Sequence, residues 1–220
     1  MKKELLPVLA QSALFQNIGQ PEIEGMLKCL GGRMKRCHDG EAILREGDPA
    51  DQLGIVLSGG AQVTRTDFNG KRSVLTEVEP GEMFAEAFAF AGVGHISVDV
   101  TAVGSTEVLL LDADRLARPC WNACEYHGRM ILNLLSVMAS KNLTMNRKLQ
   151  ITSRRTTREK LLAYLEMQAK QAGSASFTIP FDRQALADFL EVDRSGLSAE
   201  IGRLRKEGVL KSEKNRFTLL

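Results

Sequence analysis

A change in residue pattern near Asp112 does most to constrain the fold of this chain. Between about residue 32 and residue 112, short runs of Val, Ile, Leu and Phe alternate with pairs of turn-forming residues. The turn pairs include Asp39-Gly40, Gly59-Gly60, Asn69-Gly70, Pro80-Gly81 and Gly104-Ser105. Short strands at such spacing are typical of a barrel, a roll or a sandwich. Beyond Asp112 helical patterns replace the strands, so the sequence predicts an α+β chain with its β part first.

Composition and charge divide the chain in a similar way. Its 220 residues are 44% hydrophobic and 25% charged, which is within globular averages and allows two domains. Residues 1–140 carry 13 Lys and Arg against 18 Asp and Glu, whereas residues 141–220 carry 16 against 9. The last third is therefore basic. This favours a polyanionic partner, although a solvated basic surface would have the same composition.

No uninterrupted apolar run reaches the roughly 18 to 20 residues that a membrane-spanning helix needs. The start of the chain has lysines but no long apolar segment behind them, unlike a signal peptide. We therefore expect a cytoplasmic protein with no membrane partner. Its cysteines would be reduced thiols in that compartment. They are Cys29, Cys37, Cys120 and Cys124.

A long helical pattern runs from about residue 126 to residue 151, after a short one at residues 21–30. One face of the long helix has residues spaced alternately by four and three positions, which is the seam spacing of a coiled coil. These residues are Ile131, Leu135, Met138, Asn142, Met145 and Leu149. We expect this dimer interface to pair with a second copy of the chain, with the single Asn fixing the register. Packing of the stripe on the β part is the alternative.

The basic third begins with Thr156-Thr157-Arg158-Glu159, a capping box that predicts a new helix start. Asp182 and Asp193 are each suited to cap a further short helix, and a tight break at Glu191-Val192 separates the two. Two short helices around a tight turn indicate a helix-turn-helix. Two strands around Lys214-Asn215 then add a basic wing.

In such a motif the second helix presents its first turns to base edges in the major groove. Arg194 is suited to bidentate pairing with guanine, and Ser195 and Ser198 to bonds with bases or phosphate. Arg183 and Gln184 would contact phosphates from the first helix. The predicted DNA-binding residues are Arg183, Gln184, Asp193, Arg194, Ser195, Ser198, Lys214 and Arg216.

Several stretches then occur in a recognisable order. They are Gly40-Glu41-Ala42-Ile43 with Glu46-Gly47-Asp48, Ile55-Val56-Leu57-Ser58-Gly59, Pro80-Gly81-Glu82-Met83-Phe84, and Arg183-Gln184-Ala185-Leu186-Ala187 leading into Val192-Asp193-Arg194-Ser195. Together they resemble the cyclic-AMP receptor protein and fumarate-nitrate regulator (CRP/FNR) superfamily of bacterial transcription factors, over nearly the whole chain. The resemblance implies an N-terminal cyclic-nucleotide-binding-like β-roll, a long dimerisation helix and a C-terminal winged helix-turn-helix. The corresponding segments are residues 1–118, 119–152 and 153–220.

The resemblance also implies where an effector binds. The family's glutamate that bonds the ribose of a cyclic nucleotide corresponds to Glu86, and its phosphate-binding Arg-Ser pair to Ile96-Ser97. The hydroxyl pair that reads adenine falls near Met145-Asn146. Without the arginine a charge-assisted contact to the phosphate is lost, so we do not expect a standard cyclic-AMP binder. The predicted effector pocket comprises Phe84, Glu86, Phe88, Ile96, Ser97, Met145 and Asn146, and its ligand and any cofactor stay unknown.

Two other kinds of sensor within the family stay open. Cys120 and Cys124, followed by His127, would suit a thiol switch or a metal site, but small residues packed under a helix start explain them as well. His38, His95 and His127 would allow haem, although single histidines are usually only packed or surface residues. We assign no metal ligands from these patterns.

We therefore expect a homodimeric, sequence-specific DNA-binding regulator of transcription. It would sense an effector or redox signal in the roll, bind a two-fold symmetric operator and contact RNA polymerase. A haem- or metal-dependent gas or redox sensor of the same family is one alternative, and a cupin-like metal enzyme is another. The enzyme is disfavoured because the sequence has no His-x-His pair, no Gly-x-Ser-x-Gly elbow and no phosphate-binding glycine loop.

Overall fold

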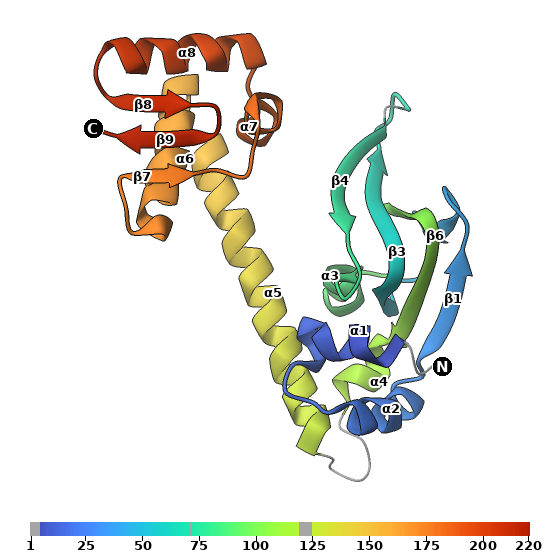
Figure 1. Cartoon of the computed structure of the whole chain (residues 1–220). Helices are drawn as coiled ribbons and strands as arrows, with labels where there is room; N and C mark the ends of the chain where they lie inside the picture. The colour runs from blue at the N-terminus through green and yellow to red at the C-terminus, as the bar shows by residue number, and fades with distance from the viewer. Residues whose placement is uncertain (1–4, 71, 119–124) are drawn as a thin grey trace. The chain divides into compact units, whose positions relative to one another are not determined.

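The computed structural model describes residues 5–70, 72–118 and 125–220 (Figure 1). The chain forms two compact units, Met1–Ala139 and Ser140–Leu220. The long helix α5, Glu125–Thr152, contributes its first half to one unit and its second half to the other. The helix α5 does not form a compact unit of its own. That residues 119–152 act as a separate dimerisation segment stays a prediction. In the described part of the chain, every helix is too short or too polar to cross a bilayer.

The first unit is built on one antiparallel sheet in the order β1-β6-β3-β4, with β2 also paired to β6 and β5 to β3. The sheet folds over a core that contains Val56, Phe84 and Val100. This is the predicted β part, and it ends at Asp112 as expected. The strands are β1 (Arg33–Cys37), β2 (Ala42–Leu44), β3 (Gln52–Thr66), β4 (Arg72–Val78), β5 (Met83–Phe84) and β6 (Asp99–Asp112).

Two of the predicted turns are wrong. Gly59-Gly60 and Gly104-Ser105 lie inside the long strands β3 and β6 rather than between strands. The pairing of β3 with β6 shifts register between Val56 and Gly60, which marks β-bulges. Gly59 adopts a φ of +74°, and a Cβ there would approach the Ser105 carbonyl to 2.5 Å. The glycines therefore bend continuous strands, which a sequence pattern alone does not distinguish from a turn.

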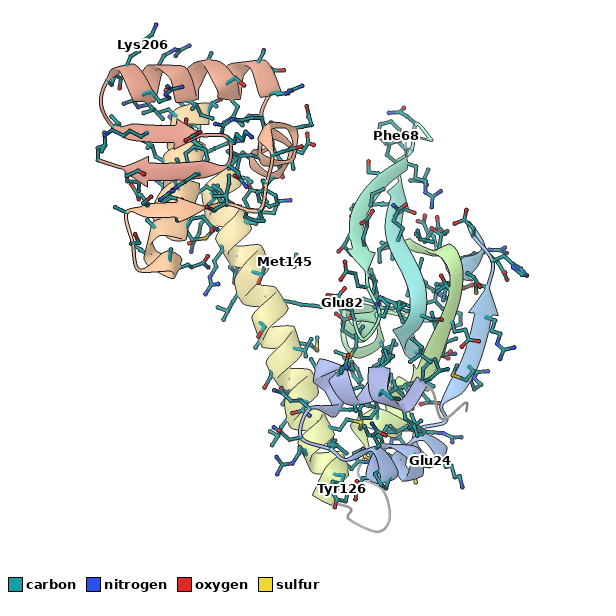
Figure 2. All side chains as sticks on the ribbon, in the orientation of Figure 1. Glu24, Phe68, Glu82, Tyr126, Met145 and Lys206 are labelled. Atoms are coloured by element: carbon teal, nitrogen blue, oxygen red, sulfur yellow. The ribbon has the colours of Figure 1, made fainter. Side chains whose placement is uncertain are left out.

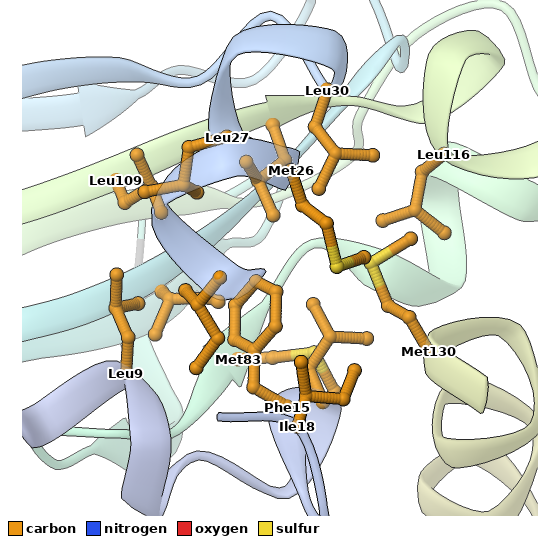
Figure 3. Close-up of a cluster of buried hydrophobic side chains, with 14 of the residues drawn as sticks. Leu9, Phe15, Ile18, Met26, Leu27, Leu30, Met83, Leu109, Leu116 and Met130 are labelled. Atoms are coloured by element: carbon orange, nitrogen blue, oxygen red, sulfur yellow. The ribbon is translucent and has the colours of Figure 1, made fainter. Parts of the chain in front are cut away.

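Short helices close one end of the sheet (Figure 1). They are α1 (Leu6–Gln11), the 3-10 turn η2 (Ala13–Phe15), α2 (Gln20–Cys29) and α4 (Ala113–Ala117), while α3 (Glu86–Phe90) follows β5. The α2 helix matches the one predicted at residues 21–30. The helices bury a cluster of large side chains against the strands, including Phe15, Met83 and Leu109 (Figure 3).

The first half of α5 packs on this helical end. Met130 and Leu134 are buried in the same cluster, and Val137 and Met138 are partly buried against it. The side-chain amide of Asn133 donates hydrogen bonds to the carbonyl oxygens of Leu14 at 3.0 Å and Gln16 at 2.8 Å. Apolar packing and two hydrogen bonds thus attach α5 to the N-terminal segment.

The second unit contains the rest of α5, three further helices and a small sheet in the order β7-β9-β8. The capping box predicted for α6 is present, because Thr156 accepts from the Glu159 N–H while Glu159 accepts from the Thr156 N–H. Buried side chains of all these helices, Ile151 of α5 among them, form one core. The elements are α6 (Thr157–Ala172), β7 (Ser176–Thr178), α7 (Arg183–Leu190), α8 (Arg194–Lys206), β8 (Leu210–Glu213) and β9 (Arg216–Leu219).

Close packing at Gly54 gives a test of the first unit. A Cβ at Gly54 would overlap the ring of Phe84, a buried core residue. We expect Gly54→Ala to lower the free energy of unfolding by about 1 to 3 kcal/mol, as overpacking of a core usually does. Urea denaturation measures this, with Gly25→Ala as control. Gly25 lies within α2 with nothing within 4 Å of its Cβ position, so alanine there should be neutral or stabilising. Equal stability of the two variants would contradict this packing.

Candidate nucleic-acid interface

Two aspartates begin the helices α7 and α8. The Asp182 carboxylate accepts from the Ala185 N–H at 2.8 Å, and the Asp193 carboxylate from the Gly196 N–H at 2.8 Å. Between the helices Glu191 adopts a left-handed φ of +54°, which makes the tight break possible. Both predicted caps and the predicted helix-turn-helix are therefore confirmed.

The first turn of α8 presents a short polar surface. Arg194, Ser195 and Ser198 are all exposed there. The Ser195 hydroxyl donates to the Asp193 carboxylate, and this bond followed by the Gly196 N–H lowers the pKa of Asp193 below its ordinary value. Asp193 is thus an ionised helix cap. These hydrogen bonds hold the first turn of α8 in position, and Arg194 in the same turn is exposed, while the DNA contacts of both residues stay predictions.

The predicted phosphate contacts on α7 have partners within the protein. The Arg183 guanidinium lies over the Phe217 ring, 5.0 Å from its centroid, and burial followed by the charge of Arg205 lowers the pKa of Arg183. Gln184 donates from its side-chain amide to the Asp188 carboxylate at 2.8 Å. Arg183 is therefore half-buried and fixed by stacking, a geometry that no sequence pattern indicated.

The wing completes this surface. The strands β8 and β9 pair as a hairpin whose turn contains Lys214, with a φ of +49°, and Asn215, whose amide donates to the Ile179 carbonyl at 3.2 Å. Lys214 and Arg216 are exposed. A hollow of about 710 Å³ collects residues from α7, α8 and the wing: Pro180, Phe181, Asp182, Arg183, Gln184, Arg194, Lys214 and Asn215. The structure thus brings together four of the predicted DNA-binding residues around one hollow.

An ionic network ties α8 to α6, and sequence reasoning missed it. Glu200 of α8 is 6% exposed and lies 3.0 Å from Arg203 Nη1 and 3.6 Å from Arg158 Nη1. Arg158 also donates two hydrogen bonds to Glu207, at 3.1 and 2.6 Å. The hydrogen bond from Arg158 holds the pKa of Glu207 below its ordinary range and raises that of Arg158. The only sequence signal was a carboxylate at a position on the helix face shared with Leu197 and Leu204.

The predicted effector residues of the roll separate into core and surface. Phe84 and Ile96 are buried, at 2% and 3% exposure, and Glu86 is buried at the start of α3. Phe88 is half-buried and Ser97 is exposed. An aliphatic side chain thus lies buried where the resemblance implies a phosphate-binding arginine, and these residues do not fit a cyclic phosphate held by the family's usual pair.

Most of the predicted dimer residues lie on the exposed part of α5. Leu135, Met145 and Leu149 are 58%, 72% and 63% exposed. Asn142 accepts a hydrogen bond from the Asn146 amide at 2.7 Å. Ile131 is half-buried. Met138 packs partly against the N-terminal core, so at this position the stripe contacts the chain's own core.

The described cysteines and His127, which the sequence offers for a redox or metal site, do not form a cluster that could hold a metal ion. Cys120 and Cys124 lie outside the described residues. Cys29 and Cys37 are free thiols, and burial raises the pKa of Cys37. His127 is buried and donates from Nε2 to the Leu116 carbonyl at 2.9 Å. Within the described residues, no group of three or more His, Cys, Asp and Glu is arranged to hold a metal ion.

A β-roll followed by a long helix and a winged helix-turn-helix defines a class of DNA-binding transcription regulators. Two family models match the chain: the cyclic nucleotide-binding domain at residues 34–120 and the Crp-like helix-turn-helix domain at residues 159–220. Together they cover more than half of it. The chain belongs to the CRP/FNR superfamily of transcription regulators, whose members are not enzymes.

Individual relatives agree with this assignment. The transcriptional activator protein FnrL of Cereibacter sphaeroides is 23% identical over 82% of this chain and 73% of its own length. A CRP-like cAMP-activated global transcriptional regulator of Mycobacterium tuberculosis is 30% identical over 53% of this chain, which spans only half of that protein. The Thermus thermophilus catabolite activator protein structure matches with a TM-score of 0.56 at 23% identity, over 95% of this chain and 94% of its own. That likeness shows a shared fold.

The pair of Arg158 and Glu207 predicts a pH dependence of stability. A carboxylate whose folded pKa is lowered stabilises the fold above its unfolded pKa of about 4.3 and loses this contribution as pH falls through the folded value. We therefore expect Glu207→Gln to lower the melting temperature at pH 7 but to approach the wild type below about pH 4. Thermal unfolding between pH 7 and pH 3 measures this. Glu213→Gln, an exposed change on β8, should have little effect at any pH. A Glu207→Gln deficit independent of pH would rule out an ionic origin.

Proposed function

We propose that the chain is a homodimeric, sequence-specific DNA-binding regulator that senses an effector or redox signal in its β-roll. The signal would pass along α5 to the winged helix, which binds a two-fold symmetric operator and works with RNA polymerase. The observation that carries the proposal is the shared hollow at the start of α7, the start of α8 and the wing, lined by Arg183, Arg194 and Lys214. A basic surface at the first turn of a recognition helix suits the major groove.

The contacts within this surface suggest a division of labour. Arg194 has an exposed side chain at the first position of α8, which supports bidentate reading of a guanine. Arg183 is fixed on Phe217, so it would meet a phosphate without losing much side-chain entropy. Exposed Lys214 at the wing tip suits a further backbone contact. Specificity would thus reside mainly in Arg194, and general affinity in Arg183 and the wing.

The exposed stripe of α5 supports the homodimer. Leu135, Met145 and Leu149 keep more than half of their surface accessible in the single chain. Large apolar side chains repeated at coiled-coil spacing lose exposed apolar surface when the helix pairs with an identical helix, and this burial stabilises the pair. A two-fold dimer would in turn present two recognition helices to half-sites about one DNA turn apart.

We infer that the effector of the roll is not cyclic AMP bound in the usual manner. Ile96 is 3% exposed at the position where the family's phosphate-binding arginine is expected, and it offers no positive charge. Glu86 is buried at the start of α3, at the position that corresponds to the family's ribose-binding glutamate. The cyclic nucleotide-binding domain would therefore respond to another ligand or to a redox change.

The role of Arg194 is tested by substitution. Arg194→Ala should reduce binding to the operator by about 10- to 100-fold, since one bidentate base contact is worth roughly 1 to 3 kcal/mol. Binding to unrelated DNA should change little. Fluorescence anisotropy with an operator selected from random sequences and with a scrambled duplex measures both. Lys214→Ala is the matched comparison, because loss of a phosphate contact should weaken both complexes equally and reduce their salt dependence. Equal losses on both duplexes for Arg194→Ala would refute base reading.

The dimer is tested on α5. Leu135→Glu places a charge on the stripe, so we expect monomers by light scattering and operator binding weakened at least tenfold. Leu143→Glu is the control, because Leu143 is similarly exposed, at 56%, but lies at an outward-facing position of the same repeat. Circular dichroism would verify that both variants are folded. If Leu135→Glu stays dimeric, the dimer axis does not follow this stripe.

A further inference from the structure

A second hollow lies wholly within the C-terminal unit, between the last turns of α5, the helix α6 and the start of the helix-turn-helix. Its volume is about 340 Å³, at the small end of the roughly 300 to 1,000 Å³ of small-molecule sites. We call it the α5–α7 hollow. Its lining consists of Thr144, Met145, Arg147, Lys148, Ile151, Tyr164, Met167, Gln168, Gln171, Pro180, Phe181 and Phe189. Met145, labelled on α5 in Figure 2, belongs to it.

Aromatic rings form one wall of the hollow. The ring centroid of Tyr164 lies 6.1 Å from that of Phe181 and 5.2 Å from that of Phe189. The centroids of the two phenylalanine rings are 5.1 Å apart. Met145 and Met167 add flexible thioethers, which adapt to different ligand shapes. Such a wall favours a flat, apolar ring system over a polar sugar.

Tyr164 has a buried hydroxyl group. The residue is 1% exposed, and within the described residues its hydroxyl has no hydrogen-bond partner. Burial raises the pKa of Tyr164 to about 12, so the group is a neutral donor at physiological pH. A buried hydroxyl without a partner destabilises a fold, and phenylalanine would fill the same space without that cost. The hydroxyl is better explained by something that it binds.

The charged side chains lining the hollow are basic. Among the described residues that line it, Arg147 and Lys148 are the charged ones, and no acidic side chain balances them. Lys148 lies over the Phe189 ring, with its Nζ 5.7 Å from the centroid. The Lys148 ammonium group lies above the aromatic wall and complements a ligand that carries an anionic group on an apolar ring. The neutral Tyr164 hydroxyl is a hydrogen-bond donor for a polar group of the same ligand.

We propose that the α5–α7 hollow binds a small aromatic carboxylate. The ring would lie against Tyr164, Phe181 and Phe189, with its carboxylate near Lys148. The Tyr164 hydroxyl is closed off in the unliganded chain, so a polar substituent of the ligand would bond to it once the lining side chains shift. The site shares Met145 with the predicted effector pocket but includes none of that pocket's residues in the roll. Phe181 precedes α7, the first helix of the helix-turn-helix, and Phe189 lies within it. Occupancy of the hollow would therefore also alter operator affinity. That last step alone depends on the proposed function.

The chain provides its own probes for a binding experiment. It contains 8 methionines, of which Met145 and Met167 line the hollow while Met26, Met83 and Met130 are buried in the N-terminal cluster. The full-length protein, labelled with ¹³C at its methionine methyl groups, is titrated with 6-hydroxy-2-naphthoate and observed by NMR. We expect the signals of Met145 and Met167 to shift together, with saturation below about 1 mM, while those of Met26, Met83 and Met130 stay in place.

Variants separate the parts of the proposal. Lys148→Gln should weaken 6-hydroxy-2-naphthoate about tenfold and leave the neutral 6-(hydroxymethyl)-2-naphthol unaffected, whereas Lys28→Gln on α2 changes neither. Tyr164→Phe should weaken binding about fivefold and raise the melting temperature of the unliganded protein. Tyr126→Phe, the same change at the 38%-exposed tyrosine of the first unit, should do neither.

Several results would overturn the site. They are no methionine shift up to 5 mM, shifts of Met145 without Met167, or equal losses of the charged and neutral ligands in Lys148→Gln. Operator affinity is measured separately in the presence of saturating 6-hydroxy-2-naphthoate. Methionine shifts without any change in operator affinity would refute the regulatory step and retain the site. Failure of the unliganded protein to bind a selected operator would instead refute the proposed function.

Discussion

The structure depends on one helix that belongs to two hydrophobic cores. Met130 and Leu134 of α5 are buried in the N-terminal cluster, and Ile151 near its other end is buried in the core of the C-terminal unit. At 1.5 Å per residue, the 28 residues of α5 extend about 42 Å. Cores are packed densely enough that a side chain in them moves only with its neighbours. A change in the roll that shifts Leu134 therefore has a covalent route to the packing around Ile151.

Much of the fold could be predicted because its signals are local. The Thr156 capping box, the Asp182 and Asp193 caps and the long apolar stripe each depend on residues within a few positions of one another. The bulges at Gly59 and Gly104 could not be separated from turns, because the distinction depends on whether a distant strand pairs on both sides of the glycine. The bonds from Asn133 to the N-terminal segment likewise join residues more than a hundred positions apart.

The candidate site was predictable in its residue types but not in their partners. Basic and hydroxyl residues at the start of α8 follow from the helix-turn-helix pattern. The pattern gave no sign that Phe217, from the last strand, would support Arg183, or that Asp193 and Ser195 would bond to each other. In the roll, the position of Ile96 was given by resemblance alone, and its burial needed the structure. Long-range packing thus decides which of several plausible polar residues remain available to a ligand.

The buried carboxylate of Glu200 constrains how any signal acts on the recognition helix. A carboxylate at 6% exposure is costly unless cations compensate it, and here Arg203 comes from α8 itself while Arg158 comes from the first turn of α6. Tilting α8 away from α6 would leave Glu200 with only one of its two partners. The two helices therefore favour moving together. A signal that reaches the start of α6 from α5 would reposition α8 together with α6, with the first turn of α8 intact.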